Sequence, residues 1–191
     1  DVTTLIPVAE RLQKRFGIRR ICVVSDRGTI SQPVIRELER RQWWYILGVR
    51  LRAVKEVRVQ VIGGLDPASG SAGRAGFEVV HGARQQRQDP AALEVKEVKV
   101  GPRRYVVCYN PEQARKDAHD RQTIVAKLQE ALKAGDKSLV GNKGFRRYLK
   151  TPPKEHAPGA PAHFAIDATK VQAEAQYDGL WVLRTNTALM A

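Results

Sequence analysis

The sequence predicts an α/β fold that starts with a strand–loop–helix unit and continues into a segment of mixed helices and strands. Three observations support this prediction: a short, branched apolar run that ends on a carboxylate, a helical pattern on each side of it, and a second apolar run rich in aromatic residues. Two strands joined by a helical crossover are expected to lie parallel in one sheet. Residues 1–52 therefore form the first part of the predicted core.

The first expected element is a helix over residues 3–16, which ends before Gly17. Residues 21–24 follow as a short, uncharged strand of the kind that is covered on both faces. A second helix is expected over residues 32–42, with Ser31 as its cap. The apolar residues that recur at helical spacing in the first helix are Leu5, Val8, Ala9, Leu12 and Phe16.

Asp26 stands at the end of the first predicted strand and is the main candidate for chemistry. In open α/β sheets ligands gather outside the carboxyl ends of strands, so this carboxylate would lie where a metal ion or a reacting group is held. The alternative is an Asp that accepts hydrogen bonds from turn amides, which is a common role for this residue. The residues alone leave both interpretations open.

The character of the chain changes after a second strand over residues 43–51, and residues 53–176 are expected to form a mixed α+β insertion subdomain with a linker. A short helical run and a connection rich in Gly, Ala and Ser lead to a hairpin over residues 93–110, where the apolar alternation slips and predicts a β-bulge. The longest helix follows over residues 111–134. Residues 177–191 then return to the core as a strand that begins after an Asp–Gly turn.

The composition favours a polyanionic partner. The chain holds 33 Lys and Arg against 20 Asp and Glu, a net charge of +13, and the excess is spread along the sequence. Nucleic acid is the first expectation and an anionic membrane surface the second. No apolar run approaches the roughly 18 residues of a membrane span, and no signal-peptide pattern opens the chain. We therefore expect a cytoplasmic protein without a membrane-spanning part.

The two cysteines are not expected to take part in chemistry. Cys22 and Cys108 both lie in predicted strands among apolar neighbours. Such residues are typical of buried, reduced thiols rather than of a disulfide or a metal pair.

Residues 137–154 are the main candidate for contact with nucleic acid. The run holds six basic residues and no acidic one, with Phe145 and Tyr148 between them. One sign of charge with interleaved aromatic residues suits contact along a nucleic-acid backbone, although a solvated basic surface is the usual explanation of such a run. The candidate phosphate contacts are Lys143, Arg146, Arg147 and Lys150.

Five blocks of the sequence, taken together and in order, are more specific than any one of them. They are VVSDRGTIS, WWYILGVRLR, YVVCYNPEQARKD, SLVGNKGFRRYLK and YDGLWVLRTNT. This set resembles the DDE-class transposases of bacterial insertion sequences, in the branch with a long insertion before the last catalytic acid. The resemblance implies a partial RNase H-like core, double-stranded DNA of transposon ends as the partner, and a homo-oligomer in the intact enzyme. It also implies two divalent metal ions, Mg²⁺ or Mn²⁺, held by three acids.

Within this resemblance Asp26 matches the middle acid, and Arg27 and Gly28 match the step that follows it. Asp26 is thus the implied catalytic residue and metal ligand, and Arg27 an implied DNA contact. The first acid would lie on a strand upstream of the sequence and the last on a helix downstream, which implies a fragment that is inactive alone and needs no metal itself. The strand over residues 21–24 would then form an exposed sheet edge. The alternative is a non-catalytic DNA-binding remnant or an inhibitor of the full transposase.

Overall fold

The computed structural model describes residues 2–28, 31–65, 75–80, 93–133, 143–150 and 164–187. The chain divides into two compact units. The first unit contains the described residues up to Leu65, residues 75–110 and the strand that begins at Leu180, whereas the described part of the second unit lies within residues 111–179. The predicted domain boundaries after residues 52 and 176 stay a prediction.

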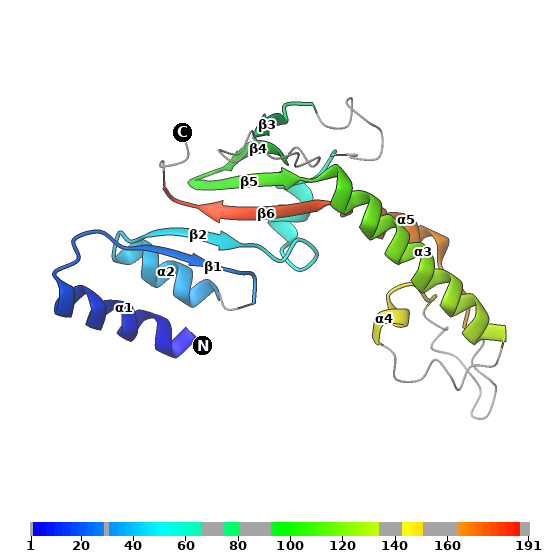
Figure 1. Cartoon of the computed structure of the whole chain (residues 1–191), viewed down its shortest axis with the longest axis horizontal. Helices are drawn as coiled ribbons and strands as arrows, with labels where there is room; N and C mark the ends of the chain where they lie inside the picture. The colour runs from blue at the N-terminus through cyan, green and yellow to red at the C-terminus, as the bar shows by residue number, and fades with distance from the viewer. Residues whose placement is uncertain are drawn as a thin grey trace, which may run out of the picture. The chain divides into compact units, whose positions relative to one another are not determined.

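The described part of the first unit is built on a six-stranded mixed sheet with the order β1-β2-β6-β5-β4-β3 (Figure 1). The parallel pairing predicted for β1 and β2 is confirmed, and the other neighbours are antiparallel. The chain is therefore a mixed α/β protein. The strands are β1 (Cys22–Ser25), β2 (Trp44–Gly48), β3 (Glu78–Val80), β4 (Leu93–Val100), β5 (Arg103–Tyr109) and β6 (Leu180–Thr185).

Two helices, α1 (Val2–Phe16) and α2 (Gln32–Arg40), cover one face of β1 and β2 (Figure 1). The apolar positions of α2 fall on one side of the helix because they are spaced by one turn. A short π-helix, η1 (Val57–Val61), also belongs to this unit. The buried residues of the core between the two helices and the sheet are Val23, Val34, Ile35, Leu38, Trp43, Tyr45 and Leu47.

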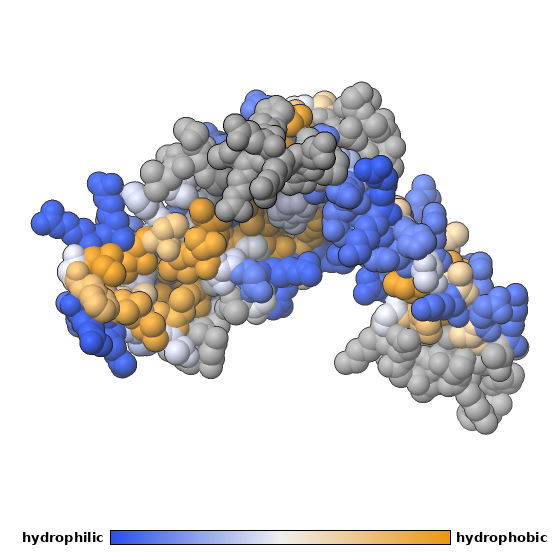
Figure 2. Space-filling model, in the orientation of Figure 1, coloured by the Kyte–Doolittle hydropathy of each residue, from blue (hydrophilic) through white to orange (hydrophobic). Residues whose placement is uncertain are grey.

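Strand β1 is covered on one face only by the described residues, so the prediction of a strand buried on both faces is wrong. Val23 is 7% exposed, whereas Val24 is 72% exposed. The reason is that both helices pack on the face of Val23, which leaves the side chains of the opposite face uncovered. Apolar residues are visible at the surface over this part of the unit (Figure 2). β1 is also an edge strand that pairs with β2 alone among the described strands, as expected.

The hairpin of β4 and β5 keeps one register from Val100↔Arg103 to Glu94↔Tyr109, so the predicted bulge is wrong. An uninterrupted register places Val95 and Val98 on opposite faces of the sheet. Each of them pairs with a buried residue of β5, Val95 with Cys108 and Val98 with Tyr105. The sheet offers apolar contacts on both faces here, so the slip in alternation needs no extra residue.

The second unit contains α3 (Pro111–Lys133), α4 (Lys143–Arg146) and α5 (Ala168–Ala175). Its core consists of Leu128, Tyr148 and Leu149, against which the predicted apolar face of α3 packs. The residues that pack against this core are Ile124, Val125, Ala131, Leu132, Phe145, Phe164, Ile166 and Val171.

No helix among the described residues is long and apolar enough to cross a membrane.

The two cysteines differ in their environment. Cys108 is buried in β5, as predicted, whereas Cys22 is exposed on the uncovered face of β1. Burial disfavours the charged thiolate and raises the pKa of the Cys108 thiol to about 11. The prediction of two buried thiols is therefore right for Cys108 and wrong for Cys22.

We predict that a thiol reagent at about pH 8.5 modifies Cys22 rapidly and Cys108 only after unfolding. Cys108 is shielded, and at that pH fewer than about one in a hundred of its thiols are ionised. Mass spectrometry of partly labelled protein measures both rates, and Cys22→Ser and Cys108→Ser variants identify each phase. Equal rates in the folded protein would contradict the burial of Cys108.

Candidate functional site

Asp26 follows β1 directly and begins an exposed turn. Its carboxylate oxygen Oδ1 accepts a hydrogen bond from the backbone N–H of Gly28 at 2.9 Å. An Asp that stabilises its own turn in this way is common, so the structural interpretation of Asp26 is confirmed. The same bond orients the carboxylate at the carboxyl end of a parallel strand, where α/β proteins hold ligands. A structural role and a chemical role are therefore compatible.

The end of β2 packs directly against this turn. β1 and β2 run parallel and end together, with Ser25 opposite Leu47. A Cβ atom added to Gly48 would lie 2.8 Å from the backbone N of Arg27, closer than such atoms approach without displacement. Residue 48 therefore has to be glycine for the turn to keep its position.

Arg50 holds the turn from the other side of Gly48. Its Nε donates a hydrogen bond to the backbone oxygen of Arg27 at 3.0 Å, and one terminal nitrogen lies 3.4 Å from the oxygen of Gly28. Sequence reasoning missed both Gly48 and Arg50. The available signal was the Gly-Val-Arg step directly after the second predicted strand, since parallel neighbours end at the same edge of a sheet.

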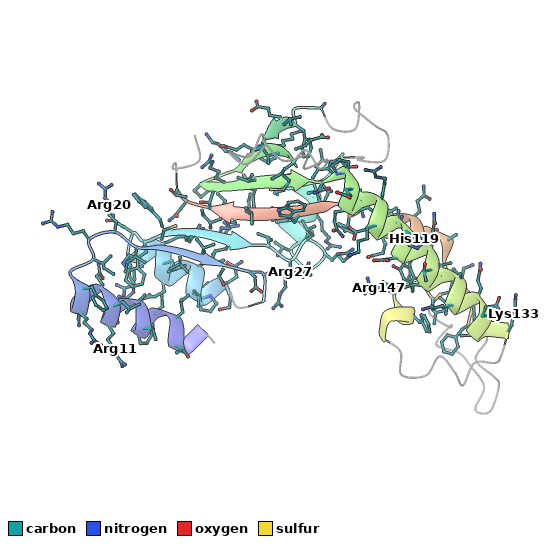
Figure 3. The ribbon with its side chains drawn as sticks, viewed as in Figure 1. Arg11, Arg20, Arg27, His119, Lys133 and Arg147 are labelled. Atoms are coloured by element: carbon teal, nitrogen blue, oxygen red, sulfur yellow. The ribbon has the colours of Figure 1, made fainter. Side chains whose placement is uncertain are left out.

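Asp26 lines an open hollow of about 310 Å³. The hollow is also lined by Arg27, by Gly48 and by Trp181 of β6, whose side chain is 37% exposed. Arg27 extends from the turn after β1 (Figure 3). Among the described residues, neither Arg27 nor Arg50 forms an ion pair with a carboxylate. The surface beside Asp26 therefore carries positive charge that is suited to phosphate groups.

The described residues do not by themselves fit the two-metal centre that the resemblance implies. No group of three His, Cys, Asp or Glu side chains in the described ranges could hold a metal ion. A two-metal site needs several carboxylates to bridge its ions, and Asp26 supplies one. The expectation of Mg²⁺ or Mn²⁺ in the intact enzyme stays a prediction.

The predicted phosphate contacts of the basic run belong to the second unit. Lys143 and Arg146 lie in α4, with side chains outside the described part of the chain. Arg147 is exposed (Figure 3), with one guanidinium nitrogen 3.6 Å from Oε2 of Glu174, and Lys150 is exposed as well. Their role in DNA binding stays a prediction.

The aromatic residues of the basic run have a structural role. Tyr148 is 3% exposed and belongs to the core of the second unit, and Phe145 packs against that core. A buried ring offers no face on which a nucleic-acid base could stack. The basic side chains, rather than the aromatic rings, are therefore the candidates for contact with DNA.

We predict that Gly48→Ala displaces the Asp26 turn and lowers the free energy of unfolding by roughly 1–3 kcal/mol, because the new methyl group overlaps backbone atoms. The amide resonances of Arg27 and Gly28 should shift in a ¹H–¹⁵N spectrum. Gly17→Ala is the control: its φ of 63° strains an Ala, but its Cβ meets nothing within 4 Å, so it should lower stability without shifting the Arg27 and Gly28 resonances. Unchanged Arg27 and Gly28 resonances in Gly48→Ala would show that the end of β2 does not support the turn.

No protein-family model, curated protein or solved structure matches this chain. The candidate site consists of the carboxylate at the end of β1, the glycine and arginine that hold its turn, and the positive charge beside it.

Proposed function

We propose that this chain is part of the catalytic core of a DDE-class DNA transposase and supplies the middle acid of that core, Asp26. The observation that carries the proposal is the position of this carboxylate after the first of two parallel strands that are joined by a helix. That edge of a sheet is where α/β proteins bind ligands. The resemblance of the five sequence blocks gives the position its chemical meaning, and an RNase H-like arrangement of β1 and β2 is part of the proposal.

The surroundings of Asp26 support phosphodiester chemistry on DNA. Arg27 lines the same hollow as Asp26, and the guanidinium of Arg50 is bonded to the backbone of the Asp26 turn; Arg groups are well suited to phosphate oxygens. In the proposed enzyme Asp26 is one of a set of three acids, and the resemblance assigns the other two to segments outside this sequence. We therefore infer that the chain alone is inactive. The resemblance further suggests that the intact enzyme is a homo-oligomer and that it acts on the double-stranded DNA of transposon ends in the cytoplasm.

A non-catalytic DNA-binding remnant, or an inhibitor of the full transposase, is the second candidate. The excess of basic residues favours it equally, because phosphate contacts need no catalytic acid. The two candidates differ in what Asp26 does. In the enzyme its carboxylate is required for strand cleavage, whereas in the remnant it only stabilises the turn through Gly28.

We predict that the chain binds duplex DNA with strong salt dependence and little sequence preference. The logarithm of the binding constant should fall against the logarithm of salt with a slope of about −0.9 for each phosphate contact. Fluorescence anisotropy measures this slope. Replacing both Arg27 and Arg50 by Ala should flatten it by about two units, whereas the control pair Arg11→Ala and Arg36→Ala, on exposed helix positions, should not.

The basic run of the second unit provides an independent arm of the same experiment. Replacing its four candidate contacts together should flatten the slope by several further units. An unchanged slope in this variant would move the DNA contact away from the run, and an unchanged slope in both variants would contradict the proposed surface. The four residues are Lys143, Arg146, Arg147 and Lys150.

We predict that the purified chain neither nicks nor joins transposon-end DNA in Mg²⁺ or Mn²⁺. In the protein extended by its natural flanking codons, strand cleavage should appear, and Asp26→Asn should abolish it without weakening DNA binding. Asp120→Asn, an exposed acid on α3, is the control and should cleave normally. Cleavage that survives Asp26→Asn would contradict the catalytic role, and an extended protein that binds but never cleaves would favour the remnant.

A further inference from the structure

A second pocket of the first unit, with a volume of about 270 Å³, is not used by the proposed chemistry at Asp26. It lies at the N-terminus of α2, the end of β2 and neighbouring parts of β5 and β6. Its apolar wall includes Ile35, Leu47 and Val54. We call it the arginine pocket because its lining includes Arg27, Arg50, Arg103 and Arg184.

Arg184 brings a buried donor without an acceptor to this pocket. Its side chain lies on β6, the residue is 5% exposed, and one terminal nitrogen donates to Oε1 of Glu39 at 2.8 Å. Its Nε is buried and has no hydrogen-bond partner among the described residues. A buried donor of a charged group that stays unpaired is strongly unfavourable. The Nε–H of Arg184 therefore lacks a hydrogen-bond acceptor in the described part of the chain.

Ser31 also has a buried polar atom without a hydrogen-bond partner among the described residues. It occupies the cap position of α2, where a Ser side chain ordinarily accepts a hydrogen bond from an amide of the first turn. Here the side chain makes no capping bond, and Oγ is buried without a partner among the described residues. Ser31 lines the arginine pocket, at the positive end of a nine-residue helix.

Among the described residues, the arginines that line the pocket outnumber their acidic partners by two. Arg103 forms an ion pair with Glu56, which also accepts a hydrogen bond from the Tyr105 hydroxyl at 2.6 Å. Burial, aided by that hydrogen bond, raises the pKa of Tyr105 to about 12, so the phenol adds no negative charge near neutral pH. Arg184 is balanced by Glu39.

The two positive charges without an acidic partner in the described part of the chain belong to arginines at the rim of the pocket. Arg27 and Arg50 form no ion pair within the described residues. An anion that carries two charges would therefore balance the site, and it would have to reach donors that lie below the surface.

We propose that the arginine pocket binds a terminal phosphate group. The Nε–H of Arg184 and the hydroxyl of Ser31 donate to its oxygens, and Arg27 and Arg50 balance its charge. A phosphate monoester carries nearly two negative charges near neutral pH and protrudes from the molecule that bears it. An internal phosphodiester of DNA carries one charge and is held between two sugars, so it fits these buried donors poorly. The inference does not rest on the transposase proposal.

Two molecules can present this group: a free nucleotide and the 5′-phosphate end of a DNA strand. In a ¹H–¹⁵N spectrum of the purified chain the Nε–H of Arg184 gives its own resonance. We expect it to shift saturably, together with the amides around Ser31, when sodium phosphate is added. Sodium chloride of the same ionic strength should leave it in place, because screening alone supplies no acceptor.

Ser31→Ala tests the site without threatening the fold, because the hydroxyl that it removes makes no hydrogen bond within the described residues. Its affinity for inorganic phosphate should fall on the order of ten-fold. Arg36→Ala, on the exposed side of the same helix, is the matched control and should bind as the wild type does. An Arg184 Nε–H that does not respond to phosphate, or a Ser31→Ala variant that binds equally well, would overturn the proposal.

The choice of ligand distinguishes a free nucleotide from a DNA end as the source of the phosphate group. The first comparison is between deoxyadenosine 5′-monophosphate and deoxyadenosine. The second is between a duplex that has 5′-phosphate ends and the same duplex with 5′-hydroxyl ends. Tighter binding of the nucleotide than of inorganic phosphate supports a small-molecule site. A shift of the Arg184 Nε–H that requires the 5′-phosphate of the duplex supports recognition of a DNA end. If neither phosphorylated molecule shifts it, the pocket is not a terminal-phosphate site.

Discussion

The parallel pairing of β1 and β2 is the constraint on which the candidate site of the first unit depends. Parallel neighbours end at the same edge of a sheet, so the Asp26 turn and the Gly48–Arg50 segment meet there. The crossover helix α2 has to begin at that edge, because it starts where β1 has ended. One topological fact thus brings together a carboxylate, two arginines and the cap position of a helix, although Asp26 and Arg50 are 24 positions apart (50 − 26).

Strand β6 completes this edge from a distant part of the sequence. It lies between β2 and β5, and its end is fixed to the start of β2 by side-chain bonds: Thr185 donates to the oxygen of Tyr45 at 2.7 Å, and Asn186 accepts from the nitrogen of Tyr45 at 2.9 Å. This register determines where Arg184 lies. A buried guanidinium needs a counter-charge, which Glu39 provides while it also accepts a hydrogen bond from the Tyr45 hydroxyl at 2.8 Å.

Local patterns predicted the elements that depend on local sequence. The helical spacing of apolar residues located α1, α2 and α3, and the branched run before Asp26 located β1, because amphipathic periodicity is read within one element. The position of Asp26 at a strand end followed in the same way. Local patterns did not predict that Val24 and Cys22 are exposed, because their exposure depends on both helices packing against the opposite face of the sheet.

The features that the sequence did not predict depend on contacts between distant segments. The need for glycine at position 48 follows from the approach of the Asp26–Arg27 backbone, which no local pattern reveals. The unpaired Nε of Arg184 and Oγ of Ser31 are visible only once β6, α2 and β2 are assembled around one pocket. Tyr148 was misleading for a related reason, because a tyrosine in a basic run can face a core as readily as a ligand.

The turn after β1 lies between two hollows with different sets of charged side chains. The hollow beside Asp26 combines a carboxylate with the positive charge of Arg27, whereas the charged residues that line the arginine pocket are mainly arginines, which attract an anion. Arg27 and Gly48 line both. A shift of the Arg27 backbone would therefore move one guanidinium toward or away from the carboxylate and change both environments together. The close contact at Gly48 and the hydrogen bond from Arg50 restrict that shift, which makes the rigidity of this turn a requirement of both proposals, the acid at Asp26 and the phosphate site in the arginine pocket.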